Sequence, residues 1–64
     1  MDLQKIREEY DQNYQQIIDT IDQMGGETKI KYHRKLRTPL YQKLKQLQQR
    51  EHYLDRLESK LQEH

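Results

Sequence analysis

Residues 3–26 read LQKIREEYDQNYQQIIDTIDQMGG and predict one long amphipathic helix followed by a glycine stop. The apolar residues of this stretch recur in steps of three and four, the period of one helix face: Leu3, Ile6, Tyr10, Tyr14, Ile17, Ile21 and Met24. Asp2 fits an N-cap, and Gly25-Gly26 accepts the left-handed conformation that ends helices. We therefore expect a helix over about 3–24 and a turn over 25–27. Tyr10 and Tyr14 should pack in the core with their hydroxyls at its rim.

A second long helix is predicted over about 39–62. Its apolar stripe consists of leucines at helical spacing: Leu40, Leu44, Leu47, Leu54, Leu57 and Leu61. Thr38 fits the N-cap and Pro39 the first helical position, where a missing N–H is harmless. Between the long helices, Tyr32 and Leu36 continue the four-residue spacing, which favours a short basic helix over about 28–37. Pro39 either separates this segment from the second helix or kinks one continuous helix.

These patterns predict an all-α fold, an antiparallel helical hairpin forming a single domain over 1–64. The chain has 64 residues, of which 31% are hydrophobic and none is cysteine, so neither a large core nor disulfides can stabilise it. Small helical proteins of this kind gain stability by self-association. We therefore expect a homodimer in which two hairpins form a helical bundle.

The leucines at 40, 47, 54 and 61 have the seven-residue spacing of a coiled coil. The intervening positions of the repeat are Leu44, Glu51 and Glu58, and the two charged residues weaken a parallel dimer seam. Two uses of the leucine stripe remain open. It packs on the first helix of the same chain, or it forms a self-association seam between chains.

Charge is strongly segregated along a chain whose net charge is only +1. Residues 28–50 contain eight basic residues and no acidic one, whereas residues 1–27 contain seven acidic and two basic residues. Five of the bases form what we call the basic cluster: Lys29, Lys31, Arg34, Lys35 and Arg37. If Pro39 breaks the helix, Asp19 and Asp22 should lie near Lys43 and Lys45. A continuous helix would instead place these acids beside the basic cluster.

The sequence argues against catalysis, metal binding and cofactor binding. It has no cysteine, one serine and no glycine-rich phosphate loop, and its histidines are too scattered for a metal site on one helix face. No small-molecule substrate is therefore expected. The absence of any long apolar run argues against a membrane span and a signal peptide, so the expected location is cytoplasmic.

Two function classes remain. The first is a small non-catalytic interaction or regulatory protein that binds a protein partner through its helical surfaces. The alternative is a nucleic-acid-binding protein that uses the basic cluster, because lysine and arginine neutralise phosphates and Tyr32 can stack on an unpaired base. The identity of the partner is not encoded in any motif of the chain.

Overall fold

The computed structural model describes residues 2–62, which are helical almost throughout. The elements are α1 (Leu3–Met24), a 3₁₀ turn η1 (Glu27–Lys29), α2 (Ile30–Leu36) and α3 (Pro39–Gln62). The all-α prediction is confirmed, and no strand occurs among residues 2–62. The outermost residues of the predicted 1–64 domain, Met1, Glu63 and His64, lie outside the described residues.

Both ends of α1 follow from local chemistry. Asp2 is the N-cap, and its Oδ1 accepts a hydrogen bond of 2.8 Å from the backbone N–H of Lys5. Gly25 is the C-cap with φ of 106°, and its N–H donates to the Asp22 carbonyl. This left-handed conformation is accessible to glycine without steric cost, which explains why the helix stops here.

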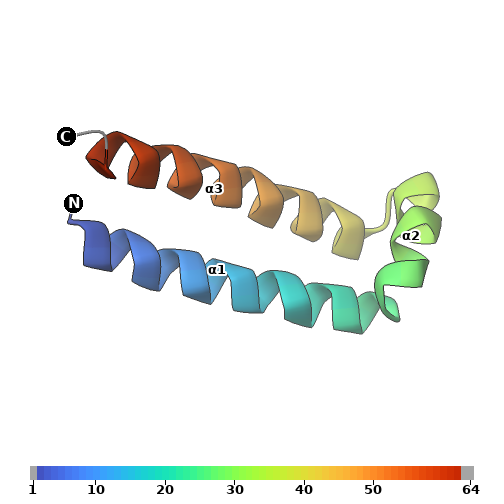
Figure 1. Cartoon of the computed structure of the whole chain (residues 1–64). Helices are drawn as coiled ribbons and strands as arrows, with labels where there is room; N and C mark the ends of the chain where they lie inside the picture. Colours follow the sequence, from blue (N-terminus) through green and yellow to red (C-terminus); the bar gives the residue numbers. More distant parts are fainter. Residues whose placement is uncertain (1, 63–64) are drawn as a thin grey trace.

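The long helices α1 and α3 lie side by side and run in opposite directions, so that the start of α1 and the end of α3 are at the same end of the molecule (Figure 1). The short helix α2 crosses the other end (Figure 1). The resulting body is elongated, with principal extents of 43 × 17 × 17 Å.

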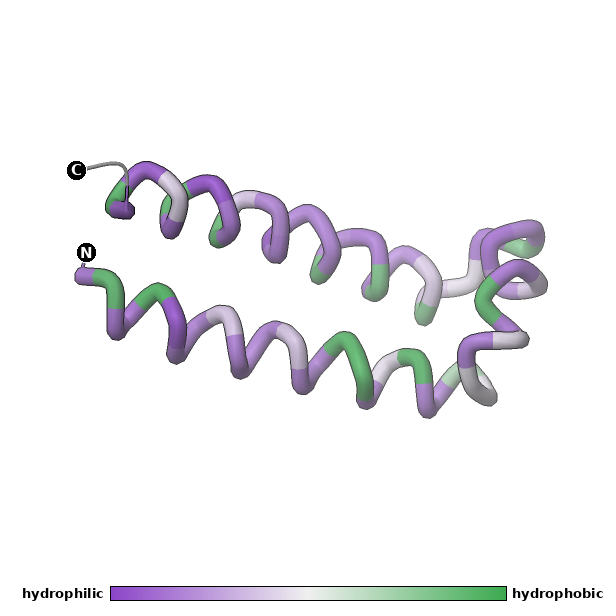
Figure 2. The backbone as a smooth tube through the Cα atoms, in the orientation of Figure 1, coloured by the Kyte–Doolittle hydropathy of each residue, from purple (hydrophilic) through white to green (hydrophobic). Residues whose placement is uncertain are grey.

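The core is a seam between α1 and α3. Figure 2 shows that the hydrophobic positions of α3 lie on the side that faces α1. The buried apolar side chains are Ile6, Ile17, Met24, Leu44 and Leu54. Ile30 of α2 packs against the part of this core nearest the turn. Within the predicted leucine stripe, Leu44 and Leu54 are buried at 1% exposure, and Leu40 and Leu47 pack against the core. Leu61 is 39% exposed, and Leu57 lines a separate surface hollow.

The structure corrects the predicted apolar face of α1. Asn13 and Thr20 are buried, at 3% and 1% exposure, where the sequence pattern placed Tyr14 and Ile21. Tyr14 is 52% exposed, so the prediction that it packs in the core is wrong, while Tyr10 is half-buried. The residues on the buried side of α1 are thus spaced by alternating steps of three and four over 3–24. The residues of α3 that face them have the same alternating spacing over 40–61.

Pro39 begins a new helix and does not kink a continuous one. Helix α2 ends at Leu36, Arg37 adopts a left-handed conformation with φ of 52°, and α3 starts at Pro39. Thr38 caps α3, because its Oγ1 accepts a hydrogen bond of 3.2 Å from the N–H of Tyr41. The segment predicted as one short helix over 28–37 consists of the 3₁₀ turn η1 and the α-helix α2.

Candidate interaction surfaces

The basic cluster lies at the turn end of the molecule, on η1, α2 and the corner that leads to α3. All five of its side chains are exposed. Tyr32 and Leu36, on the same short helix, are 60% and 59% exposed. The structure therefore presents cations and apolar side chains together on one small helix.

His33 holds this helix in place. Its Nε2 lies 2.9 Å from the Met24 carbonyl oxygen, and its Nδ1 lies 2.8 Å from Thr38 Oγ1. Since a carbonyl can only accept, Nε2 carries the hydrogen in this arrangement, and in the neutral ring Nδ1 accepts from the Thr38 hydroxyl. The Thr38 oxygen still accepts from Tyr41 N–H. One histidine thus links the end of α1, α2 and the start of α3.

The predicted neighbours of Asp19 and Asp22 are not reproduced as ion pairs. Asp19 accepts a hydrogen bond from Gln15 on its own helix. Residues 2–62 form one ion pair, between Arg50 and Glu9 at 3.9 Å, and no member of the basic cluster takes part in it. The positive charge at the turn end is therefore not neutralised by ion pairs within the described part of the chain.

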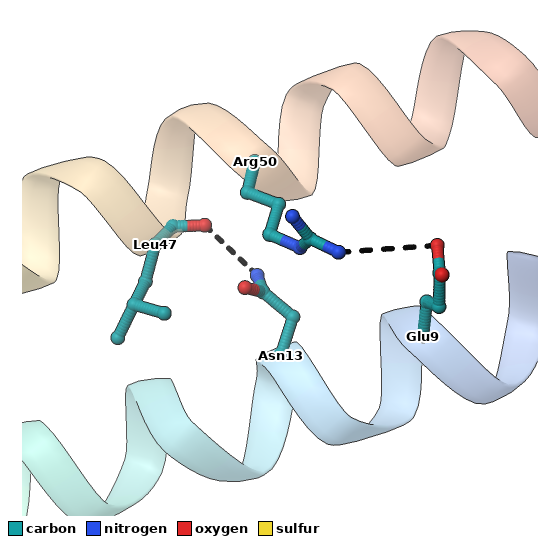
Figure 3. A network of polar contacts seen from close by, with 4 residues as sticks. All are labelled: Glu9, Asn13, Leu47 and Arg50. Atoms are coloured by element: carbon teal, nitrogen blue, oxygen red, sulfur yellow. Dashed lines mark hydrogen bonds and ion pairs between the residues drawn. The ribbon is translucent and has the colours of Figure 1, made fainter.

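A polar layer crosses the seam at mid-length (Figure 3). The buried Asn13 Nδ2 donates a hydrogen bond of 2.8 Å to the Leu47 carbonyl oxygen, and beside it Arg50 reaches toward Glu9. The ion pair is long and its arginine is exposed, so it contributes at most about 1 kcal/mol. The buried asparagine fixes how α1 and α3 are aligned, because sliding either helix would leave its amide without this acceptor.

A basic hollow of about 430 Å³ lies where α2 meets α3. It is lined by five residues: Arg34, Arg37, Tyr41, Gln42 and Lys45. Three of them are cations, and none is an acid. Only Arg34 and Arg37 belong to the basic cluster predicted from the sequence. Lys45 was missed as a site residue, although it lies within the acid-free run 28–50 that signalled the charge.

An apolar strip lies on one flank of α1. It consists of Tyr14 and Ile18, at 52% and 43% exposure. The half-buried Ile21, one turn further on, packs against the core. A smaller apolar surface lies on α3, where Tyr53 and Leu57 line a hollow of about 270 Å³ with Arg56 and Lys60. Helix α1 thus exposes Tyr14 and Ile18 while it buries the polar Asn13 and Thr20. This is the reverse of the usual arrangement, in which apolar residues lie inside and polar residues outside.

The phenol of Tyr10 lies at the acidic end of the seam. Partial burial raises the pKa of Tyr10 above its ordinary value of 10.0, and the carboxylates of Glu51, Asp55 and Glu58 on α3 raise this pKa further. The neutral phenol is therefore the form that the folded chain favours.

Among residues 2–62, no three histidine, cysteine or carboxylate side chains are grouped closely enough to hold a metal ion. No helix in that range combines the length and the apolar character needed to cross a membrane.

The chain matches no protein-family model, and no curated protein or solved structure is similar to it. Its own surfaces are therefore the basis for an assignment of function.

Proposed function

We propose that this chain is a non-catalytic interaction protein that works through its helix surfaces, and that its first partner is a second copy of itself. The observation that supports this proposal is that α1 buries polar residues and exposes apolar ones. This helix buries Asn13 and Thr20 while Tyr14 and Ile18 remain 52% and 43% exposed. Exposed apolar side chains that lie next to one another on a helix are typical of a face that a partner covers.

The exposed area leaves room for one interface of standard size. The accessible surface is 5314 Å². A compact monomer with this chain's mass of 8.0 kDa would expose only about 4,450 Å². The excess of roughly 850 Å² is close to the ~800 Å² that each partner buries in a standard protein interface.

The two copies would meet with their apolar strips in contact, as an isologous pair related by a two-fold axis. This contact brings Tyr14 and Ile18 of each copy out of water, and burying apolar area contributes about 25 cal/mol per Å² before the entropic cost of association. The antiparallel α1–α3 hairpins of the two copies would then form a four-helix bundle, in agreement with the expectation from the sequence.

The test compares two variants that add the same negative charge to α1. Ile18→Glu alters the apolar strip, whereas Gln16→Glu alters an exposed residue two positions away, on nearly the opposite side of the helix. Light scattering behind a sizing column should give a dimer mass for the unmodified chain and for Gln16→Glu, and a monomer mass for Ile18→Glu with retained helical circular dichroism. A dimer that survives Ile18→Glu, or equal dissociation of both variants, would contradict the proposed interface.

A further inference from the structure

The basic hollow between α2 and α3 is a concentration of positive charge without an ion-pair partner among residues 2–62. Its three cations, Arg34, Arg37 and Lys45, come from two helices and the corner between them. No acid lines the hollow, and none of the three cations forms an ion pair within residues 2–62. Such a concentration of positive charge raises the free energy of the chain by mutual repulsion, and an anionic ligand would relieve it.

The hollow is held in shape by contacts on both sides. His33 ties α2 to the Met24 carbonyl and to Thr38, at 2.9 and 2.8 Å. The Gln42 side chain donates to the Arg37 carbonyl oxygen at 3.4 Å, across the corner. The backbones that carry the cations are therefore positioned before any ligand arrives, which lowers the entropic cost of binding.

Arg37 adds an independent observation. It is the one non-glycine residue with positive φ, at 52°, among residues 2–62. A left-handed conformation costs an L-residue free energy, and helices usually place glycine or asparagine at this cap. Here the position carries an arginine that lines the hollow. Unfavourable backbone conformations of this kind concentrate where a side chain has a role in binding.

We propose that this hollow binds the phosphodiester backbone of single-stranded nucleic acid. Guanidinium groups bind phosphate oxygens in a bidentate manner, and further exposed cations of the basic cluster, Lys29, Lys31 and Lys35, can meet successive phosphates. Tyr32 lies two positions before Arg34, on nearly the opposite side of α2, but only three positions before Lys35. Its 60% exposed ring therefore provides a stacking surface for an unpaired base beside Lys35, outside the hollow itself. This combination of charge and aromatic surface fits a single strand better than a duplex, whose bases are already stacked. The inference does not depend on self-association.

The first experiment measures fluorescence anisotropy of labelled 15-nucleotide oligo-dT and oligo-U at about 50 and 200 mM salt. The expected dissociation constant at low salt is on the order of 1–100 µM. Four phosphate contacts to a single strand would weaken binding about 50-fold between the two salt concentrations. Absence of binding at 50 mM salt would overturn the proposal, as would binding to a duplex that is equal or tighter.

Matched variants locate the site. Arg34→Gln combined with Lys45→Gln removes two cations of the hollow, and the control, Arg56→Gln combined with Lys60→Gln, removes the same residue types elsewhere on the surface. The hollow variant should lower the logarithmic salt slope by about 1.4, while the control leaves it unchanged. Equal losses in both variants would mean that only net charge matters, and would refute the site.

Two further arms separate this ligand from other anions. Tyr32→Leu should weaken oligonucleotide binding at least about 5-fold, whereas Tyr53→Leu, at a residue with 54% exposure, should not. Equal effects of these two variants would contradict a stacking role for Tyr32. Vesicles that contain phosphatidylserine provide phosphate without unpaired bases, so binding to them in the absence of oligonucleotide binding would overturn the proposal in favour of a membrane surface.

Discussion

Replacing Arg37 by glycine should stabilise the fold, although it removes a side chain and a charge. Arg37 has φ of 52° and ψ of 47°, the left-handed conformation that costs an L-residue roughly 1–2 kcal/mol. Glycine avoids this cost but loses about 0.5–1 kcal/mol more conformational entropy on folding. The Arg37 side chain is exposed and forms no ion pair within residues 2–62, so little else is lost.

The net gain expected for Arg37→Gly lies between about 0 and 1.5 kcal/mol in the free energy of unfolding, with a central value of about 0.75 kcal/mol. For a domain of this size, the central value raises the melting temperature by about 3–6 °C. Thermal unfolding followed by circular dichroism at 222 nm measures the shift, with all variants at one protein concentration because self-association makes the midpoint depend on concentration.

Lys35→Gly is the matched control. It also replaces an exposed cation by glycine, two residues earlier, but at a right-handed helical position in the last turn of α2. Glycine at such a position should destabilise by up to about 1 kcal/mol. Opposite signs for the two variants are therefore expected. Shifts of the same sign would refute the assignment of a strained corner at Arg37. The proposed nucleic-acid site adds a second expectation, since Arg37→Gly should weaken oligonucleotide binding while it stabilises the fold.

Further substitutions test the packing and the α3 cap, and one pH titration tests the electrostatics of the seam. Leu54→Ala should lower the free energy of unfolding by about 2–5 kcal/mol in urea titrations, because Leu54 is 1% exposed, and Leu61→Ala, at 39% exposure, should cost clearly less. Thr38→Ala should cost at least about 0.5–2 kcal/mol in the same titrations, because it removes the α3 cap and also the hydrogen bond between Thr38 and His33. Tyr10 should ionise above pH 10.0, and its phenolate absorbance is identified by its loss in Tyr10→Phe. The stability that the neutral phenol gives the fold should therefore persist below pH 10.0 and be lost as the pH rises through the pKa of Tyr10 in the folded chain. Glu51→Gln should reduce this elevation of the pKa.

The positions of the long helices could be predicted because their signals are local. The expected bounds of 3–24 and 39–62 coincide with α1 and α3. Asp2, Gly25 and Pro39 act on the nearest turn of backbone, so their effects do not depend on the rest of the fold.

The face that α1 buries could not be predicted from apolarity. Tyr14 is more apolar than Asn13, yet Asn13 is the residue buried in the seam. Thr20 is likewise fully buried, while the more apolar Ile21 packs against the core only from its edge. Packing against α3 favours the face of α1 whose residues have the same three-four spacing as the facing residues of α3. Asn13 and Thr20 can be buried on this face because their side chains donate hydrogen bonds to the Leu47 and Gln16 carbonyl oxygens, respectively. This repeat is present in the sequence, but it could not be recognised from apolar residues alone because two of its positions are polar.

The basic hollow depends on tertiary contacts that local sequence patterns do not predict. Its shape follows from the left-handed Arg37 and from the contacts of His33 with Met24 and Thr38. The sequence predicted exposed positive charge in this region but placed it on residues 29–37 alone. Lys45 joins Arg34 and Arg37 only because the chain turns sharply between α2 and α3.

Sedimentation equilibrium of the unmodified chain tests the proposed self-association most directly. Between about 1 and 100 µM at physiological salt, the chain should move from its own mass of 8.0 kDa toward twice that mass, with no larger species because an isologous contact closes on itself. A mass of 8.0 kDa at the highest concentration, from a chain that unfolds cooperatively, would contradict the proposal that the apolar strip of Tyr14 and Ile18 binds a second copy.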